Sequence, residues 1–204
     1  MKITEILPRR GRIYEVRLSD GTYINLDKTF FESLSLKTGD EISENRANEL
    51  EDRSDLIRCK NRAFYYLSNS SMSEKNLRAK LIKSGFAPDC VEQVIKRCKE
   101  LLYIDDQSYA LRLKERCDQN NLSNRATADK LIMSGVSVEK VKEICLYDSF
   151  AEQEKIKKLI ETKYEKKLST KEDIRKSISS LQRKGFLFSD INSVMRNYIY
   201  STEE

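Results

Sequence analysis

One pair of adjacent carboxylates lies at an obvious structural junction of this sequence, where it could do chemistry. Asp105 and Asp106 follow the apolar residues 101–104 and precede a segment of helix formers. Such a pair could hold Mg²⁺ in a nuclease. An aspartate in front of a helix also accepts hydrogen bonds from free backbone N–H groups and places negative charge at the helix N-terminus. Because no third acidic residue is patterned around the pair, we favour helix capping over metal binding.

The cysteines and the missing histidine narrow the chemistry further. The chain has five cysteines and no histidine, and the cysteines form no CxxC pair. This scattered set predicts reduced thiols in a reducing compartment, with Cys98 and Cys145 as small core residues on apolar helix faces. Without histidine the common general base and zinc ligand are absent, and no glycine-rich phosphate loop occurs. We therefore predict no catalytic residue, no cofactor and no metal site, and we do not expect an enzyme.

The balance of charge favours an extended anionic partner. The chain holds 38 basic and 33 acidic residues, a net charge of +5. Residues 1–50 carry 8 basic and 9 acidic residues, so the positive excess lies in residues 51–204, which carry the other 30 and 24. The sequence does not begin with a basic stretch followed by an apolar run, and no segment approaches the length of a membrane span. We expect a cytoplasmic protein without membrane contact.

The pattern of residues 1–50 predicts a small β-rich N-terminal domain. Alternating apolar and polar residues indicate strands at 2–7, 12–18 and 22–26. Asp20-Gly21 is a strong hairpin signal because both residues tolerate a positive φ. We expect a short helix at 28–35, and then a turn and a last strand within 37–42. The boundary to the helical part is placed between residues 42 and 53.

The rest of the sequence repeats itself with an offset of 50 residues. LIKSGF at 81–86 returns as LIMSGV at 131–136 and as LQRKGF at 181–186. We expect the first leucine of each copy to be buried and each glycine to lie just past a helix end, where a left-handed backbone suits glycine best. Each copy also has a helix upstream, at 55–67, 107–118 and 150–163.

These copies predict a mainly α protein. The expected units are three tandem three-helix repeats at 54–103, 104–149 and 150–204, preceded by the β-rich domain. A single unit cannot bury its apolar stripe alone, so neighbouring repeats are expected to stack into an elongated array.

Basic residues are expected on the outward faces of these helices. On the helix predicted at 73–84, Lys75, Arg78 and Lys83 lie on the side away from Leu77 and Leu81. The three repeats carry net charges of +5, −1 and +3 in chain order, so two basic ends flank a nearly neutral middle. Most charged helix residues simply face solvent, and the spread therefore predicts a diffuse binding surface rather than one deep pocket.

Three segments of the sequence resemble the RecX family of RecA regulators. They are AFYYLS at 63–68, SEKNLRAKLIKSGF at 73–86 and YIDDQSYA at 103–110. The copies at 131–135 and 181–186 are similar to the later repeat motifs of the family, so the resemblance covers roughly residues 55–200. Residues 1–50 are similar to the β-rich extension of some members. The chain departs from the family pattern at 69–71 and at 119–122, where relatives often carry basic or glycine residues.

The resemblance implies a function and a partner. RecX proteins dock tandem three-helix repeats in the groove of the RecA filament on DNA and limit its ATPase, strand exchange and coprotease activity, within DNA repair, homologous recombination and the SOS response. The chain is then expected to be a monomeric inhibitor of RecA that binds single-stranded and double-stranded DNA weakly and without sequence preference. The residues expected on its RecA- and DNA-binding surface are Lys75, Arg78, Lys83, Arg112, Arg125, Lys130, Arg175 and Arg183.

Two other functions stay open at this point. The helices expected at 73–84 and 88–102 could form a helix-turn-helix that reads a base sequence, with Gln93 and Arg97 in the major groove. A metal-dependent nuclease that uses Asp105 and Asp106 is the third alternative. Sequence-selective binding to duplex DNA would indicate the helix-turn-helix protein. Mg²⁺-dependent DNA cleavage that is lost in Asp106→Asn would indicate the nuclease.

Overall fold

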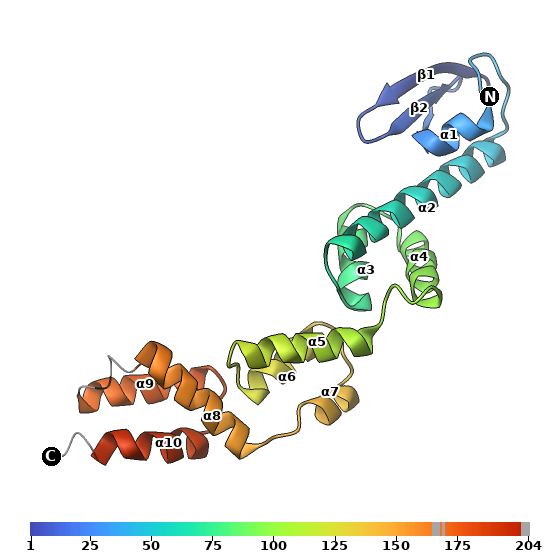
Figure 1. The fold of residues 1–204 in the computed structure, drawn as a ribbon. Coiled ribbons are helices and arrows are strands. Elements are labelled where there is room, and N and C mark those ends of the chain that lie inside the picture. Colours follow the sequence, from blue (N-terminus) through green and yellow to red (C-terminus); the bar gives the residue numbers. More distant parts are fainter. Residues whose placement is uncertain (165–167, 169, 201–204) are drawn as a thin grey trace. The chain divides into compact units, whose positions relative to one another are not determined.

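Two compact units make up the fold (Figure 1). The computed structural model describes residues 1–164, 168 and 170–200, and the chain divides between Ile104 and Asp105. The first unit holds a three-stranded sheet followed by helices, and the second unit is helical. The prediction of a mainly α protein with a β-rich N-terminal part is confirmed.

An antiparallel sheet forms the N-terminal part, with strand β1 (Ile3–Arg9), strand β2 (Ile13–Leu18) and strand β3 (Tyr23–Asp27) in that order. The alternation of the sequence buries Val16, Ile24 and Leu26 on one side of the sheet, as a period of two requires. Gly21, with φ +87°, lies in the turn between β2 and β3, where the Asp20-Gly21 signal predicts a hairpin.

Two details of this part differ from the prediction. Strand β1 continues through Pro8, which lies opposite Tyr14; a proline is tolerated there because β1 is an edge strand. The last strand expected within 37–42 is wrong, since Glu41 forms only an isolated bridge with Lys2. Gly39, with φ +99°, turns the chain just before this bridge, and the next helix begins directly after it. The extended segment between them is therefore too short for a strand.

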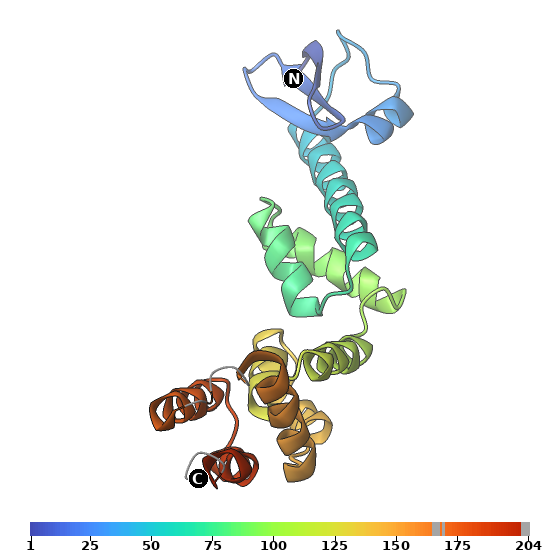
Figure 2. The ribbon, with the colours of Figure 1, turned by 60° about the vertical axis from the view of Figure 1, so that its left-hand side comes forward.

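A short helix, α1 (Lys28–Leu34), and a long one, α2 (Glu44–Asn69), follow the sheet. Figure 2 shows α2 as one continuous helix between the sheet and the next helices. Its first half buries Ala47 and Leu50 against the sheet, and its second half buries Cys59 and Ala63 in the first repeat. The sequence predicts a helix only from residue 55. The helix begins earlier because residues 44–54 contain neither proline nor glycine, so one helix serves both cores.

Helix α3 (Glu74–Lys83) and helix α4 (Pro88–Glu100) complete the first repeat. Leu81 is fully buried with Val91 and Ile95. Gly85, with φ +91°, follows α3, and the N–H of Phe86 donates back to the carbonyl oxygen of Leu81 at 3.4 Å. The predicted position of this glycine just past a helix end is confirmed.

The second unit contains the second and third repeats. The second repeat consists of helices α5 (Asp106–Gln119), α6 (Asn124–Met133) and α7 (Val138–Ile144). The third consists of helix α8 (Ser149–Leu159), the π-helical segment η1 (Ile160–Tyr164), and helices α9 (Lys171–Arg183) and α10 (Phe188–Tyr200). Within the described residues no helix is both long enough and apolar enough to cross a bilayer.

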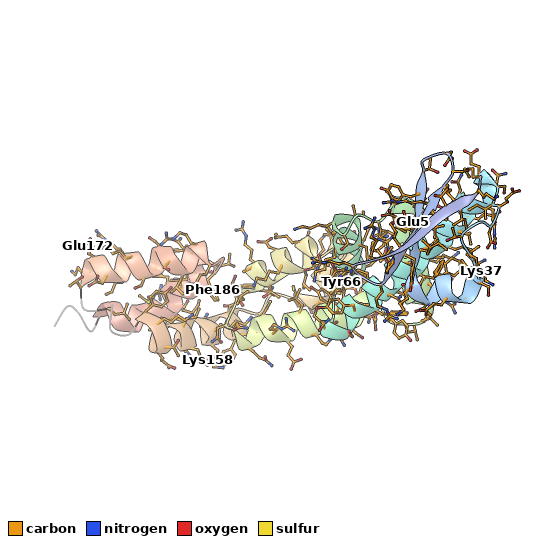
Figure 3. All side chains as sticks on the ribbon, turned by 90° about the horizontal axis from the view of Figure 1, so that it is seen from above. Glu5, Lys37, Tyr66, Lys158, Glu172 and Phe186 are labelled. Atoms are coloured by element: carbon orange, nitrogen blue, oxygen red, sulfur yellow. The ribbon has the colours of Figure 1, made fainter. Side chains whose placement is uncertain are left out.

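The equivalence of the repeats holds at their centres. Leu131 and Leu181 are fully buried like Leu81, and Gly135 and Gly185 have φ of +95° and +88°. Figure 3 places Phe186 among the helices of the third repeat, where its side chain belongs to the local core. The equivalence is weaker in α7, which ends at Ile144. Cys145 is predicted to lie on the apolar face of this helix, but it is the C-cap of the short helix and only half-buried.

Candidate nucleic-acid interface

Helix α3 presents the basic residues that the sequence places on the first repeat. The Oγ of Ser73 accepts the N–H of Asn76 and fixes the start of the helix. Because Leu77 and Leu81 are fully buried, the opposite face is turned to solvent, and Lys75 and Lys83 are exposed there. These two ammonium groups are available to a partner.

Arg78 differs from the neighbouring lysines. Its Nε donates to Glu92 of α4 at 2.6 Å, and its Nη2 donates to Glu74 at 2.7 Å. Lys99 reaches the same Glu74 at 2.8 Å. Hydrogen bonds from Lys99 and Arg78 lower the pKa of Glu74, and the hydrogen bond from Arg78 lowers the pKa of Glu92. Arg78 therefore cross-links α3 and α4, and its charge is balanced within the protein.

The other expected contact residues lie in the second unit. All five are exposed: Arg112 on α5, Arg125 and Lys130 on α6, and Arg175 and Arg183 on α9. Arg112 interacts within the protein. The two arginines of α9 lie near its start and at its end, with Ile174, Ser177 and Leu181 on the buried side of the helix.

The structure brings Lys130 together with cations that the spacing of the sequence does not connect. Arg116, Lys163 and Lys184 line one cavity of about 550 Å³ with Lys130, which we call the basic cavity. The four residues come from α5, α6, η1 and the C-cap of α9. Only the packing of the third repeat on the second makes them neighbours, so no sequence signal could have grouped them.

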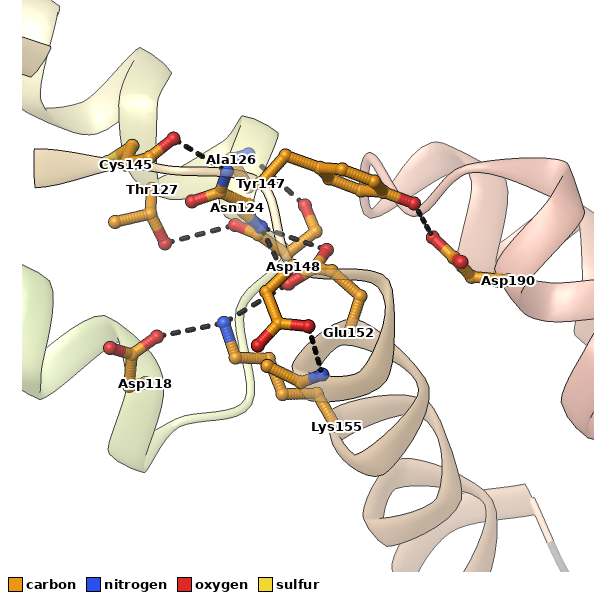
Figure 4. Close-up of polar contacts among 12 residues, drawn as sticks. Asp118, Asn124, Ala126, Thr127, Cys145, Tyr147, Asp148, Glu152, Lys155 and Asp190 are labelled. Carbon is orange, nitrogen blue, oxygen red and sulfur yellow. Dashed lines mark hydrogen bonds and ion pairs between the residues drawn. The ribbon is translucent and has the colours of Figure 1, made fainter. Parts of the chain in front are cut away.

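A polar network joins these two repeats (Figure 4). The carboxylate of Glu152, which is buried, accepts the N–H of Asn124 at 3.0 and 3.1 Å, and Lys155 lies between Asp118 at 2.8 Å and Glu152 at 3.1 Å. Burial acts to lower the pKa of Lys155, but hydrogen bonds to Asp118 and Glu152 raise it on balance. The buried charge of Glu152 is tolerated because it is paired with Lys155 and accepts the N–H of Asn124. The network fixes α8 against α5 and α6.

A second contact of the same joint involves Asp190 of α10. Its carboxylate is buried and accepts the hydroxyl groups of Tyr147 at 2.7 Å and Ser149 at 2.6 Å. The hydrogen bond to Asp190 raises the pKa of Tyr147. The chain that enters α8 is thus held to the start of α10, the last helix of the third repeat.

The aspartates and cysteines that could take part in catalysis contribute to helix capping and to the core. Asp105 is the N-cap of α5, and its Oδ1 accepts the N–H groups of Gln107 and Ser108, each at 3.0 Å. The capping interpretation is confirmed. The five cysteines are free, and burial raises the pKa of the Cys59 thiol to about 12, far from a reactive thiolate. No cluster of metal-ligating side chains occurs within the part of the chain that the structure describes.

Comparison with known proteins gives consistent matches. The family model described as "RecX, first three-helix domain" matches residues 59–98. The regulatory protein RecX of Streptococcus pneumoniae serotype 19F (strain G54) is 32% identical over 196 residues, which covers 93% of this chain and 74% of that protein. The regulatory protein RecX of Caldanaerobacter subterraneus subsp. tengcongensis is 28% identical over 197 residues, with 96% and 98% covered.

Solved structures show the same fold. The crystal structure of a regulatory protein RecX matches with a TM-score of 0.66 at 20% identity and covers 96% of this chain and 98% of that one. The crystal structure of RecX from Lactobacillus salivarius matches with a TM-score of 0.61 at 21% identity, with 72% and 99% covered.

Proposed function

This chain belongs to the RecX family, and on that premise we propose that it inhibits the RecA recombinase by binding in the groove of the RecA–DNA filament. The observation that carries the proposal is the 32% identity, over 93% of this chain, to a protein named regulatory protein RecX. Bound in the groove, the protein limits the ATPase, strand exchange and coprotease activity of the filament. It works as a monomer in the cytoplasm, in DNA repair and homologous recombination.

Unpaired basic side chains support contact with an anionic filament. Cations that are not neutralised within a protein can bind phosphates or acidic side chains of a partner. Within the part of the chain that the structure describes, exposed cations without an ion pair occur in all three repeats. From the predicted surface they are Lys75, Lys83, Arg125, Lys130, Arg175 and Arg183.

The distribution of these residues favours binding without sequence preference. Phosphate contacts position a protein on DNA but carry no sequence information. The helix-turn-helix alternative has less support, because the exposed side of α4 mixes Glu92 and Glu100 with its cations, and Arg97 is paired with Glu100 at 2.9 Å. Lys99 is also held in an ion pair, which leaves Lys96 as the exposed cation of α4 without one among the described residues. Naked DNA is therefore bound weakly and in a salt-sensitive way, and the filament more tightly.

The test is RecA-dependent ATP hydrolysis on single-stranded DNA, titrated with this protein. We expect the rate to fall with added protein, and we expect RecA to retain the protein in a pull-down only when single-stranded DNA and a non-hydrolysable nucleotide are present. Two results together would overturn the proposal: tight binding to a duplex of a preferred base sequence, and no effect of this protein on either ATP hydrolysis or strand exchange by RecA.

A further inference from the structure

Among the residues that the structure describes, the lining of the basic cavity between the second and third repeats contains four cations and no carboxylate. The apolar part of the wall comes from three leucines, Ala126 and Cys117, and the other lining residues are Asn120, Asn121 and the four cations. Arg116, Lys130, Lys163 and Lys184 are all exposed, so the charges are accessible from solvent. The cavity lies wholly within the second unit, whose repeats are joined by the contacts of Glu152, Lys155 and Asp190 described above.

The four cations are also unpaired. Among the residues that the structure describes, none of the four forms an ion pair or a side-chain hydrogen bond. Pairing is common elsewhere in the same unit: Lys114 and Lys155 both bind Asp118, and Lys157 binds Glu154. Four like charges around one cavity repel one another. A bound anion would lower this repulsion.

The local backbone at the cavity is unusual in two places. Lys163 belongs to the π-helical segment η1, a rare conformation that occurs mostly as single turns and often at functional sites. Asn121 has φ +51° and ends the turn after α5, so that Asn120 and Asn121 add amide groups to the lining. Asparagine tolerates this left-handed conformation, which is otherwise typical of glycine. Lysine and asparagine side chains are frequent donors to phosphate oxygens.

We propose that the basic cavity binds neighbouring phosphates of a nucleic-acid strand. Four unpaired positive charges around a cavity of about 550 Å³ suit a partner with several anionic groups at close spacing, and a nucleic-acid backbone supplies one charge per nucleotide in a continuous line. One acidic side chain of a protein partner supplies a single charge. The inference rests on the proposed function, in which this protein works on a DNA-bound filament, and it assigns the phosphate contact to a defined place in the fold.

The experiment measures binding of fluorescein-labelled single-stranded DNA by anisotropy over a range of salt concentrations, with no RecA present. The variant is Lys130→Gln with Lys163→Gln. Each lost phosphate contact on a single strand reduces the slope of log affinity against log salt by about 0.7, so we expect a slope smaller by about 1.4. Affinity at low salt should fall on the order of tenfold. The conservative pair Lys130→Arg with Lys163→Arg should restore both quantities.

The matched control is Lys140→Gln with Lys142→Gln, which removes two exposed lysines from α7 of the same unit, outside the cavity. An equal effect of this pair would overturn the proposal, because it would show a response to net charge alone. Unchanged DNA binding by the variant Lys130→Gln with Lys163→Gln would also overturn the proposal. This holds even if calorimetry shows that the wild-type protein binds inorganic pyrophosphate, or if the variant loses RecA inhibition. Because the DNA titration contains no RecA, its outcome is independent of whether the wild-type protein inhibits RecA.

Discussion

Gly185 packs so closely on Ser123 that a Cβ atom at position 185 would lie 2.7 Å from the Oγ of Ser123. The same Oγ donates to the carbonyl oxygen of Lys184 at 2.7 Å and accepts the N–H of Ala126 at 3.1 Å. A helix N-cap of the second repeat thus meets a helix C-terminus of the third. This contact is specific to the joint, since a Cβ at Gly85 would meet nothing within 4 Å.

This difference predicts unequal effects for the same substitution. Both Gly85 and Gly185 have a positive φ, so Gly85→Ala should lower the free energy of unfolding by about 1 kcal/mol through backbone strain. Gly185→Ala adds a clash at Ser123 and should cost about 3 kcal/mol in total. Thermal unfolding followed by circular dichroism measures both. Equal losses for the two variants would contradict the close contact at the joint.

The buried leucines of the repeats give a second prediction. Leu81, Leu131 and Leu181 are each fully buried, so alanine at each position should lower the free energy of unfolding by about 2 to 5 kcal/mol through lost burial and cavity formation. Ile82, which follows Leu81 and is 47% exposed, is the control and should cost much less as alanine. Denaturant titration is the measurement. Losses below about 1 kcal/mol at all three leucines would contradict the equivalence of the repeats.

The ion pairs of Asp118 predict a dependence of stability on pH. Burial acts to raise the pKa of Asp118, but hydrogen bonds from Lys114 and Lys155 lower it on balance. A depressed pKa in the folded state means that the carboxylate stabilises the fold above the unfolded pKa of about 3.9, and that this contribution is lost as the pH falls through the folded value. Unfolding free energy measured between about pH 5 and pH 2 should therefore fall less steeply in Asp118→Asn.

The control for this prediction is Asp129→Asn, at an exposed position of α6 in the same unit. Its profile should follow that of the wild-type protein. If both variants make the loss of unfolding free energy at acid pH equally less steep, the ion pairs of Asp118 are not the cause of that loss.

Local rules predict the repeat centres well, and contacts between distant elements explain what they miss. The glycine after each repeated leucine follows from helix termination alone, and so does the capping role of Asp105. The Glu74–Arg78 pair is also visible in the sequence as an i, i+4 spacing. Its extension to Glu92, 14 residues away on α4, depends on how two helices pack.

The basic cavity also depends on how distant elements pack, so it could not have been predicted from the sequence. Arg116, Lys130, Lys163 and Lys184 have no shared period or common helix face. The position of Lys163 depends on a π-helical turn, which no composition signal in residues 150–163 indicates. The continuous helix α2 is a different case, since its residues favour helix throughout, and only its packing on both the sheet and the first repeat depends on contacts between distant residues.

The ion pairs of Arg78 decide which residues of α3 can test RecA inhibition. Because Arg78 holds α4 through Glu92, Arg78→Ala should lower the free energy of unfolding by about 0.2 to 1 kcal/mol, the range for exposed ion pairs. Lys75 and Lys83 are exposed, and Lys75→Glu with Lys83→Glu should leave thermal unfolding nearly unchanged. This pair reverses two charges that are free to meet the filament, so it should weaken inhibition of RecA-dependent ATP hydrolysis severalfold. Inhibition as strong as that of the wild-type protein would remove the α3 face from the proposed contact surface.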